Sequence, residues 1–299
     1  MAMGKSGTNK QVMKKYLLRV INYLGSLLPK RIQRLIADFP GVLFLFQRLG
    51  RNVYEVLKTP EGYLLELNPL FHANLISKGS LTDYEPEMRK AIELATRPGQ
   101  CAYDVGANVG VFSYQFASLV GPGGRVYAFE PEPNNSQCLS RSIALNDTSN
   151  IVLDTRALGS ATKTEMFDRR GGAFSGRLVG TGSSHKPTKN LIQVETTSID
   201  HLVEQEHYLA PDVIKIDVEG NERLVLEGMR NTLERNKPVI ICELHGHLGD
   251  DVEAVFRLLK EFNYNIYSIA DFINSNIRST PLTSLGRIRH IVAVYPAGE

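Results

Sequence analysis

From Cys101 onward, short apolar runs alternate with segments of helical periodicity, and this alternation constrains the fold more than any other feature of the sequence. The runs with the length and composition of strands are 102–105, 126–129, 151–155, 213–218, 239–244, 265–269 and 288–294. Parallel strands need long crossovers between them, so this order is typical of an α/β domain with helices on both faces of a mostly parallel sheet. The last run is expected to pair antiparallel at an edge.

The sequence before Cys101 has a different organisation. Leucines and isoleucines recur at helical spacing before residue 51, and Pro60-Glu61-Gly62 lies between two alternating runs, as in a hairpin. A helix is expected over residues 85–95. The sequence therefore predicts three parts: a basic helical leader (1–51), a hairpin and helix cap (52–98) and the α/β domain (99–299).

The charge of the chain is unevenly distributed. Lys and Arg number 34 and Asp and Glu 32, a net of +2, but the leader holds ten cations and one acidic residue, a net of +9. The remainder has 24 cations and 31 acidic residues, a net of −7. Basic and apolar residues at helical spacing suit peripheral contact of residues 10–51 with an anionic membrane surface. The alternative is a helical cap that packs on the α/β domain with its cations in water.

Nucleic acid is disfavoured as a partner, because the chain has no Trp and no recognised nucleic-acid motif accompanies the basic leader. The three cysteines are widely spaced and odd in number, which excludes a disulfide framework and favours a reducing compartment. No apolar run approaches the roughly 20 residues that span a bilayer. We therefore expect a cytoplasmic protein, with the inner membrane surface as the site of any peripheral contact.

A glycine turn follows the first strand of the α/β domain, in the segment Asp104-Val-Gly-Ala-Asn-Val-Gly110. Gly106 and Gly110 let the backbone pass close to a ligand, and the helix that begins there offers unpaired N–H donors. A dinucleotide-binding turn has a third glycine where this chain has Asn108, so that a pyrophosphate can approach. The turn therefore suits a nucleoside without a phosphate better than NAD.

A carboxylate stands at the end of the second strand, in Phe129-Glu130-Pro131. Ligands of open α/β sheets bind at the carboxyl ends of the strands, where Glu130 can accept both ribose hydroxyls. The two motifs together predict S-adenosylmethionine, with Asp104 and the glycine turn near its amino-acid part. The alternative is a glycine turn and a surface acid that bind nothing.

Several blocks in order resemble the FkbM-type family of S-adenosylmethionine-dependent methyltransferases. They are Tyr84-Glu-Pro86, Asp104 to Gly110, Phe129 to Pro133 with Leu145-Asn146, Ala157-Leu-Gly159, Lys215 to Gly220 with Glu222, Val225-Leu226 and Gly228, and Ile241 to His245. The resemblance implies a Rossmann-like class I methyltransferase fold over 99–299 and methylation of a hydroxyl on a sugar, glycan or other secondary metabolite. It also adds Pro131, Ala157 and Asp217 to the expected cofactor residues. The chain departs from the family at Ser136 to Cys138, and in residues 171–190, which we expect to form a long mobile loop.

Four ionisable residues follow two neighbouring strands: Asp217, Glu219, Glu243 and His245. Alternation along the strand places Lys215, Asp217 and Glu219 on one side. Methyl transfer to a hydroxyl needs an oriented acceptor and removal of its proton. We expect these four residues to bind the acceptor or take that proton. The alternatives are that Asp217 or Glu219 caps the next helix and that Lys215 with Asp217 is a structural ion pair.

Asp217, Glu243 and His245 also have ligand types that suit a divalent metal, but sequence spacing leaves a metal undecided. Two other functions stay open at this point. One is a non-catalytic, membrane-associated binding protein on the same scaffold, and the other is an NAD-dependent oxidoreductase, which Asn108 argues against.

Overall fold

The computed structural model describes residues 53–169, 176–179, 190–246, 251–274, 280–286 and 288–296. The chain divides into two compact units, Met1–Thr82 and Asp83–Glu299. The basic leader lies outside the described residues, so its helix and its membrane contact stay predictions. No helix in the part of the chain that the structure describes is long and apolar enough to cross a membrane.

The first unit contains the expected hairpin. Strands β1 (Glu55–Lys58) and β2 (Leu64–Leu67) pair antiparallel, with Glu55 opposite Leu67. The turn between them closes with a hydrogen bond from the Thr59 N–H to the Tyr63 carbonyl, 2.8 Å long. A short helix, α4 (Ala73–Lys78), follows.

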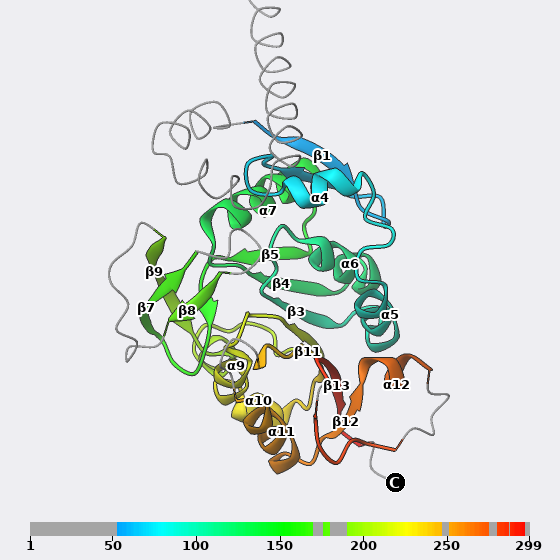
Figure 1. Cartoon of the computed structure of the whole chain (residues 1–299), viewed down its shortest axis with the longest axis vertical. Coiled ribbons are helices and arrows are strands. Elements are labelled where there is room, and N and C mark those ends of the chain that lie inside the picture. Colours follow the sequence, from blue (N-terminus) through cyan, green and yellow to red (C-terminus); the bar gives the residue numbers. More distant parts are fainter. Residues whose placement is uncertain are drawn as a thin grey trace, which may run out of the picture. The chain divides into compact units, whose positions relative to one another are not determined.

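A seven-stranded sheet forms the centre of the second unit (Figure 1). Its strands are β3 (Cys101–Val105), β4 (Arg125–Phe129), β5 (Ile151–Asp154), β10 (Val213–Ile216), β11 (Val239–Glu243), β12 (Asn265–Ser268) and β13 (His290–Val294). They lie in the order β12-β13-β11-β10-β3-β4-β5, and β13 runs antiparallel to both neighbours. The predicted Rossmann-like, mostly parallel sheet is confirmed. The last strand is indeed antiparallel, but it lies one position inside the edge.

Helices cover both faces of this sheet (Figure 1). One group is α5 (Pro86–Ala95), α6 (Val111–Val120), α7 (Pro133–Leu145) and α12 (Ile269–Asn274), and the other is α8 (Ile199–Glu204), α9 (Glu222–Glu227), α10 (Arg230–Arg235) and α11 (Val252–Glu261). Alternation along β3 explains the two layers. Tyr103 and Val105 join the large apolar core with Leu226 of α9 and Leu259 of α11, whereas Asp104 faces Ser113 of α6.

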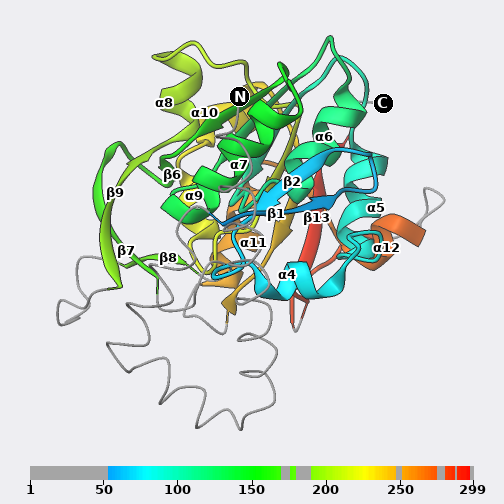
Figure 2. The ribbon, with the colours of Figure 1, turned by 90° about the horizontal axis from the view of Figure 1, so that it is seen from above.

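A second, four-stranded sheet is inserted between β5 and β10 and lies to one side of the unit in both ribbon views (Figures 1 and 2). It consists of β6 (Ala157–Leu158), β7 (Lys163–Asp168), β8 (Arg177–Val179) and β9 (Leu191–Thr197), in the order β6-β9-β7-β8. Beyond β7, Arg169 forms an ion pair with the buried Glu132 at the start of α7.

The expectation of a long loop over residues 171–190 is wrong in part. Strand β8 falls inside this range and pairs antiparallel with β7, so that Leu178 lies opposite Phe167. Both side chains are buried in a small apolar cluster with Ala157 and Val194. The Gly, Ser, Thr and Lys around the strand hide this apolar pairing in the sequence. Residues 170–175 and 180–189 lie outside the described residues.

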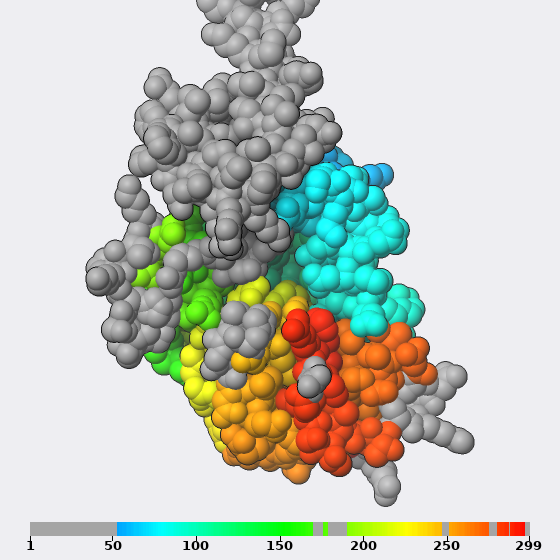
Figure 3. Space-filling view, in the orientation of Figure 1, coloured from blue at the N-terminus to red at the C-terminus, as the bar shows by residue number. Residues whose placement is uncertain are grey.

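The carboxyl-terminal part of the sheet reaches the surface of the unit. On the face drawn in Figure 3, the red segment around β13 lies between the orange segments around α11 and α12. Cys101, Cys138 and Cys242 are all buried and free of disulfides. They therefore act as small apolar side chains in the core.

Candidate active site

The glycine turn after β3 has backbone conformations that favour glycine. Gly106 has φ +77° and Gly110 φ +91°, and Asn108 between them is also left-handed at +52°. The N–H groups of Gly106 and Ala107 both donate to the Phe129 carbonyl at 3.0 Å, which ties the turn to β4. A Cβ atom on Gly106 would stand 1.9 Å from the Asp217 carbonyl oxygen. The turn and the end of β10 are thus in direct backbone contact.

The Glu130 carboxylate is buried just after the end of β4 and accepts two backbone hydrogen bonds. Its two oxygens accept the N–H groups of Asn108, at 2.7 Å, and of Glu132, at 2.8 Å. Burial raises the pKa of Glu130 to about 7, although the two N–H donors act in the opposite direction. Each carboxylate oxygen has more than one acceptor site, so both can also accept a ribose hydroxyl. These acceptor oxygens therefore fit the ribose hydroxyls of S-adenosylmethionine.

Asp104 is fully buried and is linked to the glycine turn through Lys215. Its Oδ2 accepts a hydrogen bond from Ser113 Oγ at 2.6 Å, and its Oδ1 lies 3.4 Å from Lys215 Nζ. Lys215, 2 % exposed, also donates to the Gly106 carbonyl at 3.1 Å and lies 3.4 Å from Asp217 Oδ2. Burial alone would lower the pKa of Lys215, but the charges of Asp104 and Asp217 outweigh it and raise that pKa. The lysine joins the turn to Asp217.

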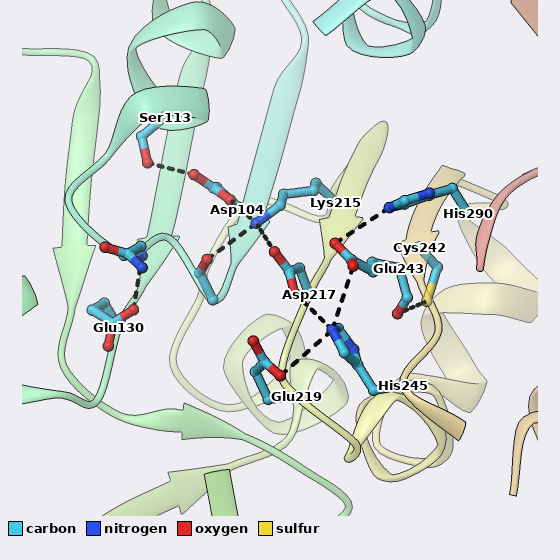
Figure 4. A network of polar contacts seen from close by, with 12 residues as sticks. Asp104, Ser113, Glu130, Lys215, Asp217, Glu219, Cys242, Glu243, His245 and His290 are labelled. Carbon is cyan, nitrogen blue, oxygen red and sulfur yellow. Dashed lines mark hydrogen bonds and ion pairs between the residues drawn. The ribbon is translucent and has the colours of Figure 1, made fainter. Parts of the chain in front are cut away.

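The four residues predicted to handle the acceptor come together around His245 (Figure 4). The His245 Nε2 atom lies 3.8 Å from Asp217 Oδ1, 3.6 Å from Glu219 Oε2 and 3.5 Å from Glu243 Oε1. The three acidic side chains are between 22 % and 24 % exposed, while that of His245 is 7 % exposed. The cluster is therefore open to solvent from its acidic side. Its catalytic role stays a prediction.

Glu219 reaches this cluster by a turn and not by strand alternation. Strand β10 ends at Ile216, two residues earlier than predicted, and Glu219 has φ +55°. The expected continuation of the pleat to Glu219 is therefore wrong. Glu222 supplies the carboxylate that accepts the Gly220 N–H before α9, at 3.0 Å.

Two supporting residues were missed as site residues from the sequence. Glu222 is fully buried, and its Oε1 lies 2.7 Å from His245 Nδ1. His290 Nε2 lies 3.4 Å from Glu243 Oε2, because the register of β11 and β13 places these residues opposite each other. A histidine directly before the apolar residues Ile291 to Val294 was the available signal for His290.

A third missed feature precedes α5. Glu85 is left-handed at φ +45° immediately before Pro86, and the neighbouring Tyr84 ring lies 6.0 Å from that of Phe112. Burial raises the pKa of Glu85, while the charge of Lys215 lowers it. The start of α5 is therefore within electrostatic reach of the cluster.

The pKa values of the acids in the cluster are shifted in different directions. Burial raises the pKa of Glu219 to about 7 and also raises that of Asp217, whereas a hydrogen bond with His290 lowers the pKa of Glu243. Burial would lower the pKa of His245, but the hydrogen bond and charge of Glu222 raise it to about 9. His245 is thus cationic at neutral pH in the ligand-free protein.

Comparison with known sequences assigns the chain. A family profile described as the methyltransferase FkbM domain matches residues 104–266, more than half of the chain and a span that includes the turn, Glu130 and the cluster. The chain belongs to the FkbM methyltransferase family. The resemblance noted in the sequence is therefore confirmed, and the FkbM-family domain coincides with the seven-stranded sheet, apart from β13 and the first residues of β3 and the last residues of β12.

Two curated proteins are similar to this chain. The hexuronic acid methyltransferase AglP of Haloferax volcanii is 31 % identical over 160 residues, which is 53 % of this chain and 61 % of AglP. The 31-O-demethyl-FK506 methyltransferase FkbM of Streptomyces tacrolimicus is 25 % identical over 248 residues, 74 % of this chain and 92 % of that protein. This chain thus spans less than two thirds of AglP and nearly all of FkbM.

Among solved structures, similar chains include the methyltransferase FkbM from Methylobacillus flagellatus KT, with a TM-score of 0.43 and 18 % identity over 69 % of this chain and 50 % of that chain. A SAM-dependent O-methyltransferase from Thermotoga maritima has a TM-score of 0.41 and 13 % identity over 82 % and 79 %.

Proposed function

We propose that this protein transfers a methyl group from S-adenosylmethionine to a hydroxyl oxygen of a sugar or other secondary metabolite. The observation that carries the proposal is the backbone contact between Gly106 and Asp217, which sets the nucleoside-binding turn against the acidic cluster. The two relatives support the acceptor class, since one is named for a hexuronic acid and the other for an O-demethyl compound.

The cofactor side of the site consists of the turn and its neighbours. S-adenosylmethionine, when bound, supplies a methyl group on a cationic sulfonium. The residues proposed to hold it are Asp104, Gly106, Asn108, Gly110, Glu130, Pro131, Ala157 and Asp217. Glu130 accepts the ribose hydroxyls, and the turn gives the backbone a close approach. Asp104, fully buried, serves by fixing Lys215 and Ser113 behind the turn.

The acceptor side consists of the acids around His245. In the reaction an oxygen–carbon bond forms as the carbon–sulfur bond breaks, the sulfur keeps the electron pair, and the hydroxyl proton leaves. Glu219 is the proposed proton acceptor, because its carboxylate is accessible and lies on a turn beside Asp217 and Glu243. Asp217, Glu243 and His245 position the hydroxyl.

Replacing Glu219 with Gln should leave cofactor binding within about twofold of wild type and lower turnover by about a hundredfold, the usual contribution of a general base. Calorimetry with S-adenosylhomocysteine and a labelled-methyl transfer assay measure the two quantities. The control is Glu234→Gln on the exposed part of α10, which should change neither. Unchanged turnover in Glu219→Gln would remove this residue from the mechanism.

The proposal as a whole is tested with the wild-type protein. We expect saturable binding of S-adenosylmethionine and transfer of labelled methyl to hydroxyl compounds in fractionated cell extract, with hexuronic acids as the first pure acceptors. Absence of cofactor binding would reject the proposal. Binding without transfer to any fraction would favour the non-catalytic alternative, and tighter binding of NAD would favour the oxidoreductase.

Cofactor affinity should rise with pH through the titration of Glu130. Its pKa is about 7, so only roughly one tenth of the molecules hold the carboxylate ionised at pH 6, against roughly nine tenths at pH 8. Because the ionised form accepts the ribose hydroxyls best, the Kd for S-adenosylhomocysteine should fall up to about tenfold between pH 6 and 8. Calorimetry at both pH values measures it.

The control for this prediction is Glu130→Gln, in which the affinity should be weaker and independent of pH. If the affinity for S-adenosylhomocysteine changes equally with pH in the wild type and in Glu130→Gln, the pH dependence of binding belongs to another group.

The effect of Glu130 on folding stability has the opposite dependence on pH. The folded-state pKa lies above the ordinary value of 4.5, so Glu130 binds its proton more tightly in the folded protein. Its contribution to the stability of the ligand-free protein is therefore lost as pH rises from about 4.5 to 7.

A further inference from the structure

Three side chains at the ends of two neighbouring strands direct ligand-type atoms to one point. Suitable atoms of Asp217, Glu243 and His245 all lie within 4.8 Å of one another. Asp217 follows β10, Glu243 ends β11 and His245 comes two residues later, so the parallel pairing of β10 and β11 brings them together. Figure 4 shows the carboxylates converging on the ring nitrogen.

In each of these side chains, the polar atom that faces away from the cluster contacts a supporting residue. Asp217 Oδ2 lies 3.4 Å from Lys215 Nζ, and Glu243 Oε2 lies 3.4 Å from His290 Nε2. His245 Nδ1 lies 2.7 Å from Oε1 of Glu222, which is fully buried. A carboxylate behind a histidine, with further groups behind the acids, is the arrangement that orients metal ligands in proteins. A merely solvated group of acids does not require it.

The distances inside the cluster match ligand separations better than hydrogen bonds. Nε2 of His245 lies 3.5 Å from Glu243 Oε1 and 3.8 Å from Asp217 Oδ1, beyond the roughly 2.7–3.2 Å of an N–H···O bond. Ligand atoms at about 2.1 Å from a divalent cation in tetrahedral or octahedral geometry stand roughly 3.0–3.4 Å apart. A small inward movement would bring these ligand atoms to coordination distance from one cation.

Charge and access favour a cation in the same place. Asp217, Glu219, Glu222 and Glu243 all surround His245, and Asp104 shares Lys215 with Asp217. These five acids outnumber the three basic groups, His245, His290 and Lys215, so negative charge is in excess when the acids are ionised. Asp217, Glu219 and Glu243 are partly exposed, which gives a cation a path from solvent and leaves coordination positions open.

We infer that Asp217, Glu243 and His245 bind a divalent first-row transition-metal cation whose remaining positions take water or the acceptor's oxygens. One nitrogen and two carboxylate oxygens suit Mn²⁺ or Zn²⁺. Binding of the cation itself does not depend on the proposed function. Only the coordination of the acceptor's oxygens rests on that function. When it coordinates the acceptor, the cation orients the hydroxyl that receives the methyl group and lowers the cost of removing its proton.

Mn²⁺ alone is the probe. The full chain is stripped with a chelator, desalted and titrated with Mn²⁺, and the free ion is followed by electron paramagnetic resonance. We expect one saturable site per chain, and at least roughly tenfold weaker binding in Glu243→Gln and His245→Gln. Glu234→Gln, outside the cluster, should bind Mn²⁺ as the wild type does. Circular dichroism of each variant verifies that it folds.

The outcomes separate the cation site from the methyltransferase activity. A wild type without a saturable Mn²⁺ site, or cluster variants that bind as tightly as Glu234→Gln, would overturn the inference. Methyl transfer that is unchanged in excess chelator would overturn the coordination of the acceptor while leaving the proposed function intact. Mn²⁺ binding in a protein that does not bind S-adenosylhomocysteine would keep the site and reject the proposed function.

Discussion

Replacing Gly106 with alanine should abolish detectable cofactor binding and cost about 3 kcal/mol of folding stability. Two effects combine at this position. The backbone is left-handed at φ +77°, and the new Cβ would stand 1.9 Å from the Asp217 carbonyl oxygen, a backbone atom that cannot rotate away. Relief requires the turn and the end of β10 to separate. Urea unfolding and calorimetry with S-adenosylhomocysteine measure the two losses.

Gly79→Ala is the matched control. Gly79, the C-cap of α4, is also left-handed, at φ +68°, but a Cβ atom there would meet nothing within 4 Å. This variant should therefore lose only the conformational part, about 1 kcal/mol, and bind the cofactor normally. If both variants lose the same stability and retain binding, the contact between the turn and β10 has no functional weight.

Lys215→Met should be the second severe change, with a loss of about 3–5 kcal/mol, because it leaves the buried Asp104 carboxylate without its cation. Lys215 is 2 % exposed and Asp104 is fully buried, so water cannot replace the lost ammonium group. The Gly106 carbonyl loses its donor in the same step. Urea unfolding measures the loss, and acceptor kinetics should show a lower kcat as Asp217 shifts.

Two further variants make this prediction specific. Lys90→Met removes the exposed partner of Glu93 and should change stability by no more than about 0.5 kcal/mol. Asp104→Asn combined with Lys215→Met should lose less than the sum of the two single changes, since neither charge is then left alone. Additive losses in the double variant would contradict an ion pair between these residues.

The sheet could be predicted from the sequence because its strands are short apolar runs separated by long crossovers. Runs such as 126–129 and 213–218 carry this signal regardless of what surrounds them. Strand β8 carries none, because its burial depends on pairing with β7, across residues whose composition favours a loop. Pairing partners are non-local, and a one-dimensional pattern does not encode them directly.

The residues of the candidate site could be predicted from the sequence better than their arrangement in space. Carboxyl ends of parallel strands share one edge, which is why Asp217, Glu243 and Glu130 could be assigned to it. Glu219 reaches the cluster through a left-handed turn that the alternation rule does not foresee. Glu222 and His290 act through contacts with His245 and Glu243, and such supporting partners emerge only from the packed structure.

The shared backbone contact between the turn and β10 also limits how this protein can diversify. Gly106 and Asp217 touch through main-chain atoms, so neither segment can move without displacing the other. Remodelling this contact for a new acceptor would therefore displace the cofactor turn as well. The inserted four-stranded sheet is joined to α7 through the Arg169–Glu132 ion pair and takes no part in this contact. Laboratory libraries for altered substrates should therefore leave the turn and the end of β10 unchanged.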